Sequence, residues 1–112
     1  MTAEKRREVT EAFRLYARKK ADGKTVETFG FDEWLTVSAV AKTLSYFRAM
    51  GKPHIAEAVE WVYFADPFEP LRKGDIDGRI TRYCMEKDAY LESVYRWLKN
   101  ARRIYWAIRH YE

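Results

Sequence analysis

The chain has 112 residues, of which 47% are hydrophobic, 16% aromatic and 34% charged, and its formal net charge is +4. This length excludes a large multi-domain enzyme and predicts a single domain over 1–112, and the apolar content excludes a disordered chain. The single cysteine excludes an internal disulfide and, even with both histidines, a structural zinc site, so we expect no metal and no cofactor. The charged start and the absence of a run of about 20 apolar residues predict a cytoplasmic protein without a membrane segment.

Three helices are predicted in residues 1–64. The first begins at Thr2, a good N-cap, and ends at Lys20, with a loop over 21–31. The second begins with Asp32 as its N-cap and ends at Gly51. The expected inward positions of these two helices are Val9, Phe13, Tyr16, Ala17, Trp34, Val37, Ala41, Leu44 and Phe47. The third helix begins at Pro53 and ends near residue 64.

Two more helices are predicted after a loop over 65–74, which contains two prolines and a glycine. Asp75 or Asp77 can cap the fourth helix, whose inward positions are Ile76, Ile80, Tyr83 and Cys84. After a turn over 87–89, the last helix begins near Tyr90 and continues to the end of the chain. Its apolar stripe comprises Leu91, Val94, Leu98, Ala101, Tyr105 and Ile108. The expected fold is therefore all-α, with about five helices.

The last two helices, over 75–112, have the pattern of a helix-turn-helix. Where two helices cross closely, the first needs a small side chain and the turn needs a residue that tolerates a left-handed backbone; Cys84 and Asp88 fit these places. The exposed face of the last helix would present Tyr90, Glu92, Ser93, Tyr95, Arg96, Lys99, Asn100 and Arg103. Such side chains can bond base edges or phosphates, so the sequence predicts a DNA-binding surface.

The string Ser-Val-Tyr-Arg-Trp-Leu, within 92–102, resembles the recognition helix of sigma factor region four and of phage late-gene regulators of the RinA and ArpU type. The stretch 58–64 is similar to the helix that precedes the motif in such regulators, so the resemblance covers about residues 55–108. It departs at Asp88, where glycine is usual, and at Tyr90, where a serine often begins the recognition helix.

The resemblance implies a sequence-specific transcription regulator of a phage or prophage that binds double-stranded DNA. Tyr95, Arg96 and Lys99 would enter the major groove. Four further cations would neutralise phosphates, namely Arg79, Arg82, Arg102 and Arg103. The resemblance also implies RNA polymerase or another host protein as a further partner.

The charge distribution leaves two other partners open. Residues 1–20 carry seven basic and three acidic side chains, 21–78 carry six and ten, and 79–112 carry eight and four. The basic ends suit DNA, but charge alone also suits RNA, as in antitermination. The acidic middle suits a protein-binding module, such as a phage-encoded inhibitor or adaptor of a host nucleic-acid machine, and contains Glu57, Glu60, Asp66, Glu69, Asp75 and Asp77.

Several features favour a structural interpretation over a catalytic one. The chain contains no phosphate-binding glycine loop, metalloprotease motif or nucleophile elbow, so we expect a protein that is not an enzyme. Cys84 is expected to be a small buried apolar residue, and His54 a surface or capping residue. Trp106, His110 and Tyr111 lie outside the last apolar stripe, which indicates either a homodimer contact or a wider core.

Overall fold

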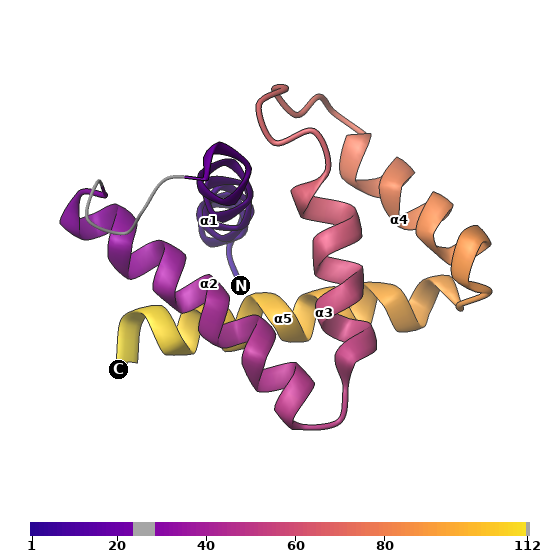
Figure 1. Cartoon of the computed structure of the whole chain (residues 1–112). Helices are drawn as coiled ribbons and strands as arrows, with labels where there is room; N and C mark the ends of the chain where they lie inside the picture. Colours follow the sequence, from indigo (N-terminus) through magenta and orange to yellow (C-terminus); the bar gives the residue numbers. More distant parts are fainter. Residues whose placement is uncertain (24–28, 112) are drawn as a thin grey trace.

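The computed structural model describes residues 1–23 and 29–111, and all regular elements in these ranges are helical (Figure 1). They are α1 (Ala3–Asp22), α2 (Phe31–Ala49), α3 (Pro53–Val59), its π-helical continuation η2 (Glu60–Phe64), α4 (Asp75–Lys87) and α5 (Leu91–Tyr111). The predicted all-α class is confirmed, although the π-helical turn was not predicted. None of the helices described is both long and apolar enough to cross a bilayer.

The longest helix, α5, is the element on which the others assemble. It packs against α2 and α3, while α1 packs against α2, η2 and α5. Helix α4 folds back from the start of α5 and rests on η2 (Figure 1). The first and last helices of the chain are therefore neighbours, and His110 Nε2 near the end of α5 lies 3.3 Å from Glu8 Oε2 on α1.

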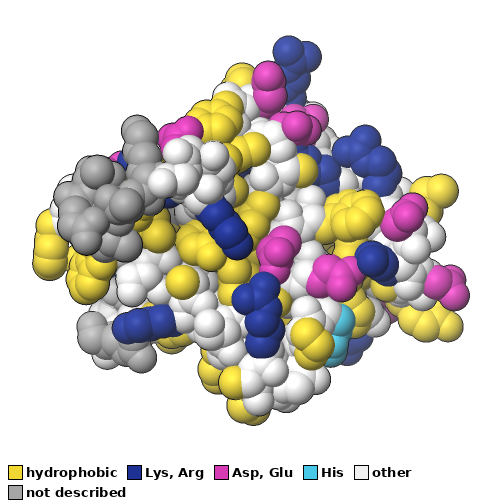
Figure 2. Space-filling view, in the orientation of Figure 1, with side chains coloured by type: hydrophobic (Ala, Val, Ile, Leu, Met, Phe, Trp, Pro, Cys, Tyr) yellow, Lys and Arg dark blue, Asp and Glu magenta, His cyan; other side chains and the backbone are white. Residues whose placement is uncertain are grey.

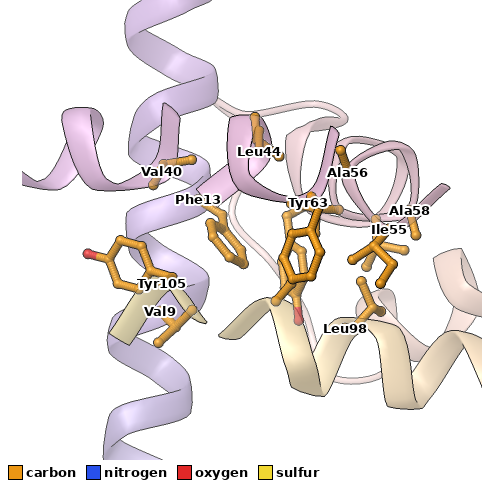
Figure 3. Close-up of a cluster of buried hydrophobic side chains, with 14 of the residues drawn as sticks. Val9, Phe13, Val40, Leu44, Ile55, Ala56, Ala58, Tyr63, Leu98 and Tyr105 are labelled. Atoms are coloured by element: carbon orange, nitrogen blue, oxygen red, sulfur yellow. The ribbon is translucent and has the colours of Figure 1, made fainter. Parts of the chain in front are cut away.

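Side chains from all of these packed elements meet in one core. Figure 3 shows Phe13 of α1 between the rings of Tyr63 and Tyr105. Its ring centroid lies 5.0 Å from that of Tyr63 and 5.6 Å from that of Tyr105, in tilted and edge-on arrangements typical of aromatic pairs. Leu98 of α5 and Ile55 of α3 continue the core beyond these rings. The predicted inward positions of α5 at 94, 98, 101 and 105 are confirmed as buried.

Two predicted apolar stripes need correction. On α2 the buried positions are Ala39, Val40, Thr43, Leu44 and Phe47, whereas Trp34 is 43% exposed. Apolar residues occur around much of this helix, so the pattern does not single out one face, and Thr43 can be buried because its hydroxyl donates to the Ala39 carbonyl at 2.7 Å. On α5, Leu91 is 47% exposed because it lies at the tip beside the α4–α5 turn, away from the core.

The helix starts and ends follow the predicted signals with four exceptions. Thr2 caps α1, and its hydroxyl accepts a bond from the Lys5 amide at 3.2 Å. However, α1 ends at Asp22, because Gly23 is the residue that turns left-handed, with φ 66°. Asp32 is not the N-cap of α2; that residue is Gly30, whose amide donates to Glu33 Oε1 at 3.2 Å. Helix α2 ends at Ala49, two residues before Gly51.

The predicted cap of α4 is also wrong. Its N-cap is Gly74, whose φ of 88° favours glycine. Asp75 is the first helical residue, and its carboxylate accepts a bond from the Arg72 amide at 2.7 Å, so it holds the preceding loop instead. The predicted turn after α4 is confirmed, because Asp88 adopts a left-handed backbone with φ 51°.

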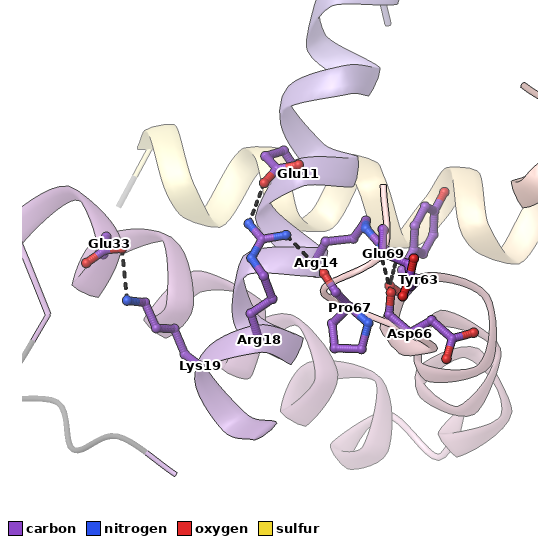
Figure 4. A network of polar contacts seen from close by, with 9 residues as sticks. All are labelled: Glu11, Arg14, Arg18, Lys19, Glu33, Tyr63, Asp66, Pro67 and Glu69. Atoms are coloured by element: carbon purple, nitrogen blue, oxygen red, sulfur yellow. Dashed lines mark hydrogen bonds and ion pairs between the residues drawn. The ribbon is translucent and has the colours of Figure 1, made fainter. Parts of the chain in front are cut away.

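A buried arginine holds the loop between η2 and α4. Arg14 is 3% exposed and donates to the carbonyl oxygens of Tyr63, Asp66 and Glu69 at 3.2, 2.8 and 2.5 Å (Figure 4). It also donates to the Ala65 carbonyl at 3.3 Å. The Tyr63 carbonyl lies in the last turn of η2 and the other three follow its end, where the backbone no longer supplies helical donors. Burial, followed by the nearby charges of Arg79 and Arg18, lowers the pKa of Arg14.

Arg79 is a second buried arginine, and its predicted contact with phosphate is wrong. It is 8% exposed, and its Nη1 donates to the Val62 carbonyl at 2.9 Å. A guanidinium in this position satisfies a carbonyl of η2 and is not presented to solvent. The pattern of α4 could not distinguish it from Arg82, which is exposed three residues later.

Candidate nucleic-acid interface

A groove of about 890 Å³ lies between the N-terminal end of α1, the start of α3 and the middle of α5. Among the residues that the structure describes, none of those lining the groove carries a carboxylate. The lining includes seven cationic residues, which are Lys5, Arg6, Lys52, Arg96, Lys99, Arg102 and Arg103. It also contains Trp97, Trp106 and His54. Positive charge and aromatic surface are therefore combined at one place.

The helical period of α5 produces one side of this groove. Arg96, Lys99 and Arg103 follow steps of three and four residues, so they share one face, and all three are exposed. The core-facing stripe of α5 fixes the rotation of the helix. Trp97 and Trp106 lie between the two faces, half-buried, with part of each indole packed against the core and part facing the groove.

The two basic ends of the chain meet here, since α1 contributes Lys5 and Arg6 from its first turns. Lys5 Nζ lies 5.0 Å from the centroid of the Trp106 ring, which is a cation–π contact. Across the groove, Lys52 directly precedes α3, and the His54 ring lies edge-on to Trp97 with centroids 4.6 Å apart. Trp97 and Trp106 are nine residues apart, which is two and a half turns, so they lie at opposite edges of the exposed face of α5, with Arg96, Lys99 and Arg103 between them.

Neutral partners hold three of the four groove arginines. Arg102 Nη1 donates to the Tyr63 hydroxyl at 3.1 Å, and Arg103 Nη2 donates to Asn100 Oδ1 at 2.8 Å. Arg96 Nη2 lies 3.4 Å from the Ser93 hydroxyl. Within the described part of the chain, no groove cation forms an ion pair with a carboxylate. Their positive charge is therefore left for an anionic ligand.

The structure brings together five of the eleven predicted DNA-binding residues. Arg96, Lys99, Asn100, Arg102 and Arg103 all line the groove. Tyr95 is also exposed, as the prediction requires, but it lies outside the groove lining. Its hydroxyl donates to Asp77 Oδ1 at 2.7 Å, and this bond is the main reason that the pKa of Tyr95 is raised. Ser93 is half-buried, and its hydroxyl oxygen accepts a bond from Arg96 Nη2.

The tip formed by the α4–α5 turn has a different character. Tyr90 is 84% exposed there, and Glu92 is exposed in the first turn of α5. Glu86 and Asp88 are exposed beside them. Carboxylates repel phosphate, so the surface suited to an anion begins further along α5, at Arg96.

The acidic middle of the chain is largely engaged in contacts within the protein. Glu57 pairs with Lys87 at 3.0 Å, and Glu60 pairs with Arg48. Asp77 accepts the Tyr95 hydroxyl. Over α4, Figure 2 shows basic and acidic side chains interspersed. These contacts reduce the negative charge that this face offers to a basic partner, and the protein-binding alternative stays a prediction.

Sequence reasoning did not place Lys52, His54, Trp97 or Trp106 in a site. The basic character of both chain ends was the only signal of an anion-binding surface. It did not point to Lys52 and His54, which come from the acidic segment, or to the two tryptophans, which resemble core residues. Trp106 does pack against the core, which supports the wider-core interpretation. Tyr111 is 81% exposed, and a homodimer stays a prediction.

Comparison of the chain with protein-family models, with curated proteins and with solved structures found no match. Across residues 1–23 and 29–111, no group of three or more His, Cys, Asp and Glu side chains is placed to hold a metal ion. The lone thiol, Cys84, is half-buried and free. The groove is therefore interpreted from its own chemistry.

Proposed function

We propose that this protein binds duplex DNA through α5 and the adjoining groove, and that it acts as a transcription regulator by docking, without catalysis. The observation that carries the proposal is the set of seven groove cations without a carboxylate among them. Each cation that contacts a phosphate releases a bound counterion and so favours association. Five of these cations, Lys5, Arg6, Lys52, Arg102 and Arg103, contact phosphates in this proposal, so the logarithm of the binding constant should fall with the logarithm of salt concentration with a slope of about −4.5.

The arrangement of α4 and α5 supports duplex DNA as the ligand. Helix α4, of 13 residues, is joined to α5 through residues 88–90, with Asp88 left-handed as a helix-turn-helix requires. An α-helix about 10–12 Å wide fits a major groove about 12 Å wide. In this proposal Arg96 and Lys99 contact base edges, while Lys5, Arg6 and Lys52 hold the flanking phosphates.

Removing two cations tests this assignment. Arg96→Ala together with Lys99→Ala is expected to weaken binding of a dye-labelled 20-base-pair duplex about 10–100-fold, measured by fluorescence anisotropy. The salt slope should change by less than about one, because the lost contacts are to base edges and not to phosphates, and the preference among duplex sequences should relax. A panel of duplexes taken from the DNA around the gene that encodes this protein then identifies the preferred sequence.

Arg72→Ala together with Lys73→Ala is the matched control, because it removes the same charge from an exposed loop outside the groove. This variant should keep nearly the full affinity and slope. Equal loss in both double variants would reduce the effect to net charge and contradict the proposal. Absence of duplex binding at 50 mM salt would also contradict it.

A further inference from the structure

We propose that the groove binds an unpaired nucleic-acid strand that crosses the exposed face of α5, with bases against Trp97 and Trp106 at its two edges and phosphates on the cations between them. This inference rests on the proposed function for the affinity of the groove cations for nucleic-acid phosphates, and it adds an unpaired strand as a second form that the same cations can hold. The groove combines the two features that proteins use to bind single strands without reading their sequence. These are a positively charged channel for the backbone and aromatic rings for the bases.

Base pairing determines which form of nucleic acid can contact the groove tryptophans. In a duplex the bases are stacked inside and the phosphates face outward, so a base reaches a protein pocket only when it is unpaired or extruded. A duplex lying across the groove would contact Arg96 and Lys99 but would leave the indoles of Trp97 and Trp106 unused. A single strand can occupy the 890 Å³ groove and contact both kinds of residue.

The contacts of Trp106 allow a base to replace a side chain of the protein over its indole ring. One ring contact is the Lys5 ammonium, 5.0 Å from the indole centroid, and another is the His110 ring, with centroids 4.0 Å apart. Lys5 has a long flexible side chain, and a cation–π contact at an exposed site is weaker than base–aromatic stacking. A base can therefore replace the ammonium over the indole while Lys5 pairs with a phosphate.

Trp97 offers a second aromatic surface on the same helix. Its indole is fixed by the core on one side and by the edge of the His54 ring on the other. Lys52 and Arg96 line the groove beside it, so phosphates on either side of a base at this position would meet a cation. The nine-residue separation of Trp97 and Trp106 spans about 13.5 Å along α5 and half a turn around it, so one strand reaches both indoles only by crossing Arg96, Lys99 and Arg103 with several nucleotides.

Tryptophan fluorescence provides the direct test. Trp34 and Trp61 lie outside the groove and are 43% and 37% exposed. In the Trp34→Phe, Trp61→Phe variant, only the groove indoles emit, and octathymidylate should quench this emission. The octamer should bind about tenfold or more tighter than an abasic strand of equal charge, because stacked bases add affinity that phosphates do not. Octauridylate in the same titration shows whether RNA or DNA is preferred.

Trp106→Leu should remove most of this base-dependent gain, whereas Trp61→Leu should leave it unchanged; circular dichroism verifies that both variants fold. Equal affinity for the octamers and the abasic strand, or absence of quenching in the double Phe variant, overturns the inference. If the duplex still binds in that case, the proposed function stands. If neither duplex nor single strand binds, both proposals fail.

Discussion

Replacing Arg14 by Met should destabilise the fold strongly, although Arg14 lies outside the groove. The change keeps most of the aliphatic volume but removes the donors of four backbone carbonyls. The Tyr63 carbonyl is buried, while those of residues 65, 66 and 69 are partly accessible to water, so their bonds are partly replaced. Breaking a buried charged network of this kind costs about 3–5 kcal/mol.

Urea unfolding followed by circular dichroism measures this cost. With a slope of about 2 kcal/mol per molar, the midpoint should fall by about 2 M. Arg18→Met is the control, since that side chain is 27% exposed and reaches one carbonyl, that of Pro67 at 3.3 Å; its loss should cost under about 1 kcal/mol.

Arg14→Lys separates charge from geometry. Lysine keeps the charge but lacks the planar fork that reaches several carbonyls at once, so it should restore less than half of the lost stability. The reasoning is refuted if Arg14→Met costs no more than Arg18→Met, or if Lys restores the full free energy of unfolding.

Two further predictions concern the fold. Burial is the main cause that raises the pKa of Tyr83 and Tyr105 above the ordinary value of about 10. The stability associated with these neutral phenols is therefore complete below about pH 10 and is lost as pH rises through the folded pKa values. The urea midpoint should fall as pH rises above about 10, less so in Tyr83→Phe, and an unchanged midpoint would contradict this. Asp88→Gly should stabilise the fold by about 0.5–1 kcal/mol in thermal unfolding, because glycine adopts the φ of 51° without a side-chain clash; a lower melting temperature would count against this view of the turn.

Local signals predicted the helices well and their caps less well. Proline and glycine mark chain breaks through their own backbone chemistry, so the division into five helices followed from the sequence. Asp32 and Asp75 have side chains that suit an N-cap, but each lies inside its helix. The N-caps of α2 and α4 are Gly30 and Gly74. A cap depends on the exact path of the incoming chain, which neighbouring elements determine. The π-helical turn of η2 was missed as well, because the spacing of apolar residues over this stretch is the same as in an α-helix.

Tertiary packing decides which arginines face a ligand, and local sequence could not. Arg79 and Arg82 are three residues apart on one helix, yet one donates to the Val62 carbonyl in the core and the other is exposed. The difference arises from η2, which lies against α4 and leaves a carbonyl without a helical partner. Arg14 follows the same logic on α1. The free carbonyls around a guanidinium group therefore decide whether it stabilises the fold or faces a ligand.

The groove shows why a surface can be chemically simple and still be hard to predict. Its cations come from positions as far apart as Lys5 and Arg103, and they meet because α1 and α5 pack together while α3 covers one flank. Basic residues at both chain ends signalled an anionic partner, but Lys52 comes from a segment whose total charge is negative. Coulomb attraction depends on distance in the folded chain, so the local sum of charge around α5, and not the sum along the sequence, determines where an anion binds.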